Sequence, residues 1–153
     1  MNAALRIGII GLGAAGGAAA RRLLSTAPPE LSLTVFDKVP AQCEPLRGAA
    51  TLAASAQEVL RESDLIVLAL PGPREIDRTL ERFSDGKVGA DIRGKLLWNL
   101  RALPAAAAAG LDLAVRAAGA AYIAGGADEA ARTLPPGFDT ADARKALLAM
   151  GAT

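Results

Sequence analysis

Three glycines near the start of the chain have the spacing of a phosphate-binding loop. They belong to the segment Gly11-Leu12-Gly13-Ala14-Ala15-Gly16, which has the pattern G-x-G-x-x-G. In this pattern Gly11 allows a tight turn, Gly13 lets the backbone approach a pyrophosphate, and Gly16 lets a helix pack on a strand. N–H groups at the start of that helix bind an anion without a basic side chain. The segment predicts a pyrophosphate site, and the alternative is a turn without a ligand.

An acidic residue stands where ribose recognition would require one. Asp37 follows a β-favouring run about 20 residues after the glycines, and a carboxylate at that place accepts hydrogen bonds from ribose hydroxyls. Its charge would repel the 2′-phosphate of NADP, which favours NAD. Lys38 carries the opposite charge, so NADP stays open. The other interpretation of Asp37 is a turn residue at a strand end.

Two later strand ends carry further candidate contacts for a dinucleotide or a substrate. Leu70 and Pro71 close an apolar run, and we expect them to line the far half of a dinucleotide, although a rigid turn before a helix is an equal alternative. Asn99 and Arg101 stand at the next strand end as candidate substrate contacts. The planar guanidinium of Arg101 suits a carboxylate or phosphate, and a solvated surface arginine is the alternative.

Composition excludes several classes of chemistry. The 153 residues contain one cysteine, Cys43, and no histidine, which excludes a disulfide framework, a His-ligated metal site and a Ser-His-Asp triad. Tyr122 is more often a packing residue than a proton donor. A net charge of +1 gives no sign of a nucleic-acid or membrane partner, and no apolar run approaches the roughly 20 residues of a membrane span. We expect no metal and a soluble, cytoplasmic protein.

The chain alternates between β-favouring and helix-favouring segments, which predicts one α/β domain over residues 1–153 with an open, doubly wound, mainly parallel sheet of the Rossmann type. The expected strands are residues 5–10, 31–36, 50–53, 65–70, 95–100 and 120–124. The expected helices are residues 14–24, 55–63, 74–83, 104–118, 127–132 and 142–149, with Pro40 and Pro45 in a loop and Phe83 on the apolar face of its helix.

These features together resemble a known family, the nucleotide-binding half of the β-hydroxyacid dehydrogenases, which include 3-hydroxyisobutyrate and 6-phosphogluconate dehydrogenases. The resemblance rests on residues 7–16, 35–37 and 64–73, and extends less closely over residues 94–126. It implies hydride transfer between NAD(P) and a small hydroxy acid, with Leu70 and Pro71 on the nicotinamide side.

The chain also departs from that family. A Ser/Thr-rich segment that helps to hold substrate is replaced by residues 99–104, Asn-Leu-Arg-Ala-Leu-Pro, and the segment before Gly125 reads Tyr-Ile-Ala. The all-helical second domain with the catalytic lysine has no room, and Lys145 does not correspond to that lysine. The resemblance therefore implies a cofactor domain and leaves the catalytic residues unknown.

Three hypotheses for function follow. The first is an NAD(P)-dependent oxidoreductase, completed by a partner chain or acting on an unusual small substrate. The second is a non-catalytic dinucleotide-binding sensor or accessory module. The third is a fragment of a longer enzyme. Because the missing domain would leave an apolar face, we expect a homodimer or a complex with a partner chain.

Overall fold

A single six-stranded sheet forms the centre of the protein. The computed structural model describes residues 5–26 and 31–151. All strands are parallel and follow the order β3-β2-β1-β4-β5-β6. Their bounds are β1 Leu5–Ile10, β2 Leu31–Phe36, β3 Thr51–Leu52, β4 Leu65–Leu68, β5 Leu96–Asn99 and β6 Ala121–Ala124. The predicted doubly wound Rossmann-type sheet is confirmed, and it is entirely rather than mainly parallel.

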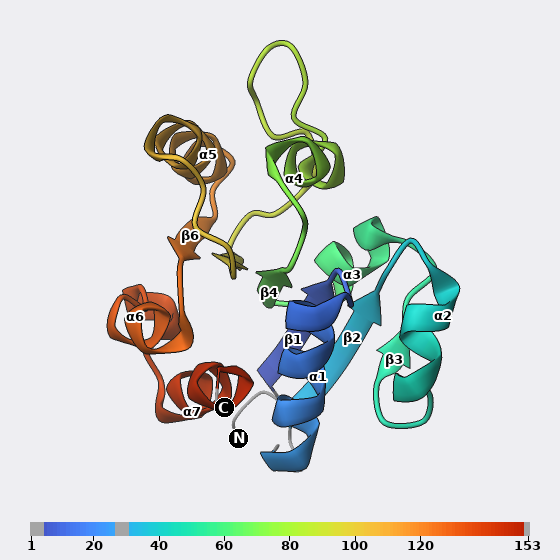
Figure 1. Cartoon of the computed structure of the whole chain (residues 1–153). Coiled ribbons are helices and arrows are strands. Elements are labelled where there is room, and N and C mark those ends of the chain that lie inside the picture. The colour runs from blue at the N-terminus through green and yellow to red at the C-terminus, as the bar shows by residue number, and fades with distance from the viewer. Residues whose placement is uncertain (1–4, 27–30, 152–153) are drawn as a thin grey trace.

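Helices cover both faces of this sheet. Figure 1 shows α1, α6 and α7 on one face and α3, α4 and α5 on the other. The helices are α1 Ala14–Thr26, α2 Pro40–Cys43, α3 Ala56–Glu62, α4 Pro73–Leu80, α5 Ala105–Ala117, α6 Ala127–Arg132 and α7 Ala141–Met150, with short 3₁₀ turns η1 Glu44–Leu46 and η2 Pro136–Phe138. No helix in this part of the chain is long and apolar enough to cross a membrane.

The side chains of each strand alternate between two apolar cores. Ile7 and Ile9 of β1 pack toward α1 and α7, while Ile66 and Leu68 of β4 pack toward α3 and α4. Trp98 lies in the first core, fully buried, and its indole N–H donates to the carbonyl of Gly125 at 2.9 Å. Because helices cover both faces of the sheet in the described residues, the strand ends are where a ligand can reach it.

Two local expectations were wrong. The segment with Pro40 and Pro45 is not an open loop but contains α2 and η1, because Pro40 occupies the first turn of α2, where a missing N–H costs nothing. The helix expected to reach Phe83 stops at Leu80, since Glu81 adopts the left-handed conformation with φ of 55°. Phe83 therefore lies outside the helix, and 68% of its surface is exposed.

Candidate functional site

A cleft of about 590 Å³ opens at the carboxyl ends of the central strands. It lies where β1 has β2 on one side and β4 on the other, so that the strand order reverses. In open parallel sheets this switch point is the usual ligand site. The volume falls within the range of small-molecule pockets. The lining residues are Ile10, Gly11, Gly13, Ala14, Ala15, Phe36, Asp37, Lys38, Ala54, Ser55, Ala56, Gln57, Ala69, Leu70, Pro71, Glu75, Arg78, Thr79, Leu100 and Arg101.

Two glycines of the loop are required by the backbone around them. Gly11 has a φ of 99°, its N–H donates to the carbonyl of Phe36 at 2.8 Å, and a Cβ there would overlap the carbonyl oxygen of Ala69. Gly16 is buried in the first turn of α1, and a Cβ there would overlap the carbonyl oxygen of Gly11. Both glycines hold α1 close to the ends of β1 and β4.

Gly13 has a different reason to be glycine. It is exposed to the cleft, and a Cβ built on it would meet no protein atom within 4 Å. The first backbone bond of α1 runs from the N–H of Gly17 to the carbonyl of Gly13 at 2.8 Å, so the N–H groups of Ala14, Ala15 and Gly16 precede the helical ladder. The loop thus presents open space beside the positive end of a 13-residue helix.

The Asp37 carboxylate is fixed at the end of β2 by the neighbouring backbone. Its Oδ2 accepts from the N–H of Leu12 at 2.6 Å, and its Oδ1 accepts from the N–H of Val39 at 2.8 Å. An ionised carboxylate offers about four acceptor positions, so about two remain for a ligand. The side chain of Leu12 is buried, which leaves its backbone as the part that shapes the cleft.

The far end of the cleft is formed by the turns after β4 and β5. Leu70 and Pro71 line it, and Arg101 joins them by donating from Nη1 to the carbonyl of Pro71 at 3.3 Å. Asn99 is fully buried and does not line the cleft, so its burial does not support the predicted substrate contact. Its amide instead donates to the hydroxyl of Tyr122 at 3.2 Å.

Tyr122 is a packing residue of β6, 7% exposed. Burial raises the pKa of its hydroxyl, and the hydrogen bond from Asn99 opposes this effect. The hydroxyl lies in the core between β6 and α5 rather than in the cleft. Tyr122 is therefore not placed to exchange a proton with a bound ligand.

Several cleft residues have no strong signal in the sequence. Glu75, Arg78 and Thr79 form the cleft side of α4, opposite the buried Ile76 and Leu80. Gln57 of α3 joins them by donating to the carbonyl of Thr79 at 3.5 Å. The helical spacing of Ile76 and Leu80 shows that the intervening residues face away from the core, but the sequence does not show that this face meets a cleft.

A family model describes nearly the whole chain. The model of the NAD binding domain of 6-phosphogluconate dehydrogenase matches residues 6–148. The chain belongs to this family. The match covers the glycine loop, Asp37, five strands completely and β1 from its second residue, so the 6-phosphogluconate dehydrogenase-like resemblance is confirmed. No curated protein matches the sequence.

Solved structures similar to this family member include several reductases. An imine reductase from Aspergillus terreus is 23% identical in sequence and superposes with a TM-score of 0.72. The matched region is 97% of this chain and 53% of the imine reductase chain. A reductive aminase from Aspergillus terreus in complex with NADPH and ethyl levulinate is 27% identical and has a TM-score of 0.67. The matched region is 78% of this chain and 40% of the aminase chain.

A variant imine reductase from Myxococcus stipitatus in complex with NAD⁺ is 26% identical and has a TM-score of 0.67. The matched region is 78% of this chain and 38% of the reductase chain. The chain thus spans between 38% and 53% of the length of these three proteins.

Proposed function

We propose that this chain binds a nicotinamide dinucleotide in the cleft at the carboxyl end of the sheet. The observation that carries the proposal is the space at Gly13, which no protein atom fills and which adjoins the free N–H groups of α1. A pyrophosphate fits this place in charge and in shape. Family membership supports the same ligand class.

Different residues of the cleft are proposed to contact successive parts of the dinucleotide. The backbone of residues 13–15 faces the pyrophosphate, and the remaining acceptor positions of Asp37 face the adenosine ribose. Phe36, Arg78 and Thr79 also line the cleft, and we propose them for the adenine, because a guanidinium can stack on an aromatic base. Leu70 and Pro71 stand at the opposite end for the nicotinamide.

The proposed cofactor is NAD rather than NADP. The Asp37 carboxylate is held in place by two backbone N–H groups, so it cannot easily move away from a 2′-phosphate. Two cations of the cleft, Lys38 and Arg78, are in no ion pair within the described residues and favour NADP. Solved reductases of similar fold hold either NADPH or NAD⁺. We propose that the fixed carboxylate dominates.

The proposed activity is that of the cofactor half of an oxidoreductase. A bound nicotinamide dinucleotide would supply or accept a hydride, and this chain would orient it and exclude water from one side. The substrate proposed from the family is a small hydroxy acid, while the similar reductases point to an imine as the second substrate class. Since the chain spans about half of these proteins or less, we propose that a further domain, in the same or in another chain, completes the site.

One observation favours a non-catalytic dinucleotide module instead. At the nicotinamide end, the titratable residues described are Glu75 and Arg101, while Asn99 and Tyr122 are buried behind them. An arginine does not give up its proton near neutral pH, which leaves one carboxylate as a proton carrier. Hydride transfer without a second chain would contradict this alternative.

Association with a second copy or a partner chain is part of the proposal. Phe83 and Leu113 are 68% and 73% exposed, although single apolar residues at a surface are common. Light scattering at high protein concentration tests this point, and a monomer at all concentrations would contradict it.

Calorimetric titration of the folded chain with NAD⁺, NADH, NADP⁺ and NADPH tests the proposed ligand. We expect saturable binding with a one-to-one ratio and higher affinity for the NAD pair. If no form binds, the proposed function is wrong. A spectrophotometric assay with small hydroxy acids and cyclic imines then separates the oxidoreductase from the non-catalytic module.

A further inference from the structure

A buried hydrogen-bonded chain connects the core to the nicotinamide end of the cleft. The hydroxyl of Tyr122 accepts from the Asn99 amide at 3.2 Å, and Oδ1 of Asn99 accepts from the backbone N–H of Arg101 at 3.2 Å. Asn99 is fully buried, so both ends of its side chain are used inside the protein. The backbone after β5 is therefore tied to β6.

The guanidinium of Arg101 is held from the other side. Its Nη1 donates to the carbonyl of Pro71 at 3.3 Å, which connects the turn after β5 with the turn after β4. Arg101 takes part in no ion pair among the described residues, and one of its five N–H donors is used by Pro71. A charged fork with free donors thus lies at the edge of the cleft, in contact with the turn after β4.

We infer that Arg101 binds the carboxylate of a small substrate beside the nicotinamide, and that Asn99 and Tyr122 position it. This inference rests on the proposed function. The planar fork of an arginine binds a carboxylate through two parallel hydrogen bonds. Glu75 also lines the cleft, and its carboxylate lies beside Gly72 in the turn after β4, so it repels a carboxylate and directs an anion toward Arg101. One guanidinium neutralises the single negative charge of a carboxylate, but it would leave one charge of a phosphate dianion unpaired.

The same arrangement explains why Asn99 is polar although it is buried. A buried amide without partners is costly, and here each end of the amide has one partner. Asn99 does not touch the substrate. Its side chain holds the backbone at Arg101 in place, and the Arg101 side chain reaches the cleft from there. Tyr122 fixes the orientation of the Asn99 amide.

The test uses the chain saturated with NADH and oxamate as the probe, a small carboxylate that NADH does not reduce. Oxamide, its uncharged analogue, is the matched ligand control. The variants are Arg101→Gln, Arg101→Lys and Tyr122→Phe. Arg74→Gln is the matched protein control, because Arg74 lies exposed on α4 and does not line the cleft. NADH binding and thermal unfolding are measured for each variant.

We expect oxamate but not oxamide to bind the NADH complex. Arg101→Gln should weaken oxamate binding about tenfold to hundredfold, and Arg101→Lys by less, while NADH affinity stays within about twofold. Tyr122→Phe should weaken oxamate binding without changing NADH affinity, which a general loss of stability would not do. Arg74→Gln should leave both affinities unchanged.

Three outcomes would overturn the inference, and they differ from one another. NADH binding without oxamate binding overturns it and leaves the proposed function intact. Equal oxamate affinity in Arg101→Gln and the unmodified chain does the same. Failure of NADH to bind overturns the proposed function and this inference together.

Discussion

Oδ2 of Asp37 accepts a 2.6 Å hydrogen bond from the backbone N–H of Leu12, so the end of β2 is connected directly to the glycine loop after β1. Oδ1 of the same carboxylate accepts from Val39. Asp37 thus holds the glycine loop in place. In the proposed complex, its remaining acceptor positions bind the ribose.

The first prediction concerns cofactor preference. Asp37→Ser removes the negative charge but keeps an oxygen that can accept a hydrogen bond. We expect NAD affinity to fall about tenfold to hundredfold, because charge-assisted bonds to the ribose are lost, and NADP affinity to change less or to rise with Lys38 nearby. Calorimetric titration measures both.

Asp85→Ser is the matched control for that change. Oδ1 of Asp85 also accepts a backbone N–H two residues on, from Lys87, but Asp85 lies in an exposed loop away from the cleft. It should leave both affinities unchanged. An unchanged ratio of NAD to NADP affinity in Asp37→Ser would contradict the assignment of Asp37.

The second prediction separates two glycines of one loop. Gly13→Val should abolish detectable dinucleotide binding with little effect on stability, since the added atoms enter open space that the pyrophosphate would occupy. Gly16→Ala should instead lower the free energy of unfolding by about 1–3 kcal/mol, because its Cβ would overlap the carbonyl oxygen of Gly11.

Urea unfolding and NADH titration of both variants check this difference. The same loss of stability in the two variants would show that the space at Gly13 is not open in solution. Undiminished binding in Gly13→Val would remove Gly13 from the site.

The third prediction concerns two serines at the ends of α3. The hydroxyl of Ser63 is buried and has no hydrogen-bond partner among the described residues, so Ser63→Ala should raise the free energy of unfolding by about 1 kcal/mol. Ser55 caps the helix by accepting from the N–H of Glu58 at 3.2 Å. Ser55→Ala should lower the free energy of unfolding by about 1 kcal/mol. Chemical denaturation measures both, and effects of the same sign would contradict the prediction.

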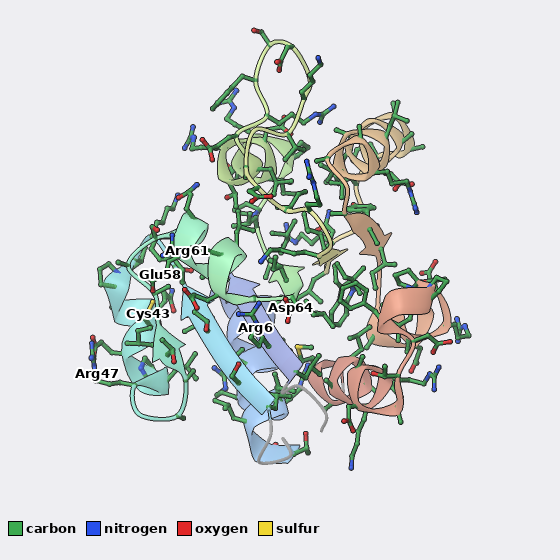
Figure 2. The ribbon with its side chains drawn as sticks, turned by 180° about the vertical axis from the view of Figure 1, so that it is seen from behind. Arg6, Cys43, Arg47, Glu58, Arg61 and Asp64 are labelled. Carbon is green, nitrogen blue, oxygen red and sulfur yellow. The ribbon has the colours of Figure 1, made fainter. Side chains whose placement is uncertain are left out.

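The fourth prediction is a pH dependence of stability. Asp64 lies beside Arg6 at the edge where β1 and β4 begin, with Oδ1 2.9 Å from Nη2 of Arg6 (Figure 2). Hydrogen bonding to Arg6 lowers the pKa of Asp64 below its ordinary value of 3.8, and partial burial opposes this. A lowered pKa means that the ion pair stabilises the fold fully above about pH 5 and is lost as the pH falls through the lowered pKa.

Thermal unfolding of Asp64→Asn and the unmodified chain measures this contribution. We expect the unmodified chain to be more stable at about pH 7, by no more than about 1 kcal/mol because both side chains are 44% exposed. The difference should shrink steadily as the pH falls through the lowered pKa of Asp64. A difference that does not change with pH would mean that Asp64 acts through its shape rather than its charge.

Much of the fold follows directly from the sequence. Strand β4 is a continuous apolar run, β1 is a largely apolar run that ends at glycine, and helices such as α5 have enough residues to show their periodicity. The edge of the sheet that carries Asp37, Pro71 and Arg101 also follows, since parallel strands end on the same side.

Other features depend on packing that the sequence does not display. The four residues of α2 are too few for a periodic pattern. The end of α4 is set by Glu81 in a conformation more typical of glycine, so the helix stops before Phe83 without a warning signal. Asn99 stands at a strand end, but only the position of Tyr122 on the next strand shows that its amide is used internally.

We propose that a dinucleotide binds over the glycine loop. The most direct measurement is the change in backbone amide resonances of the ¹⁵N-labelled chain on titration with NAD⁺. We predict the largest changes at Gly13, Ala14 and Ala15, with further changes at Leu12 and in the turns after β2 and β4, and little change on α6 and α7. Unchanged resonances at Gly13, Ala14 and Ala15 at saturating NAD⁺ would contradict the claim.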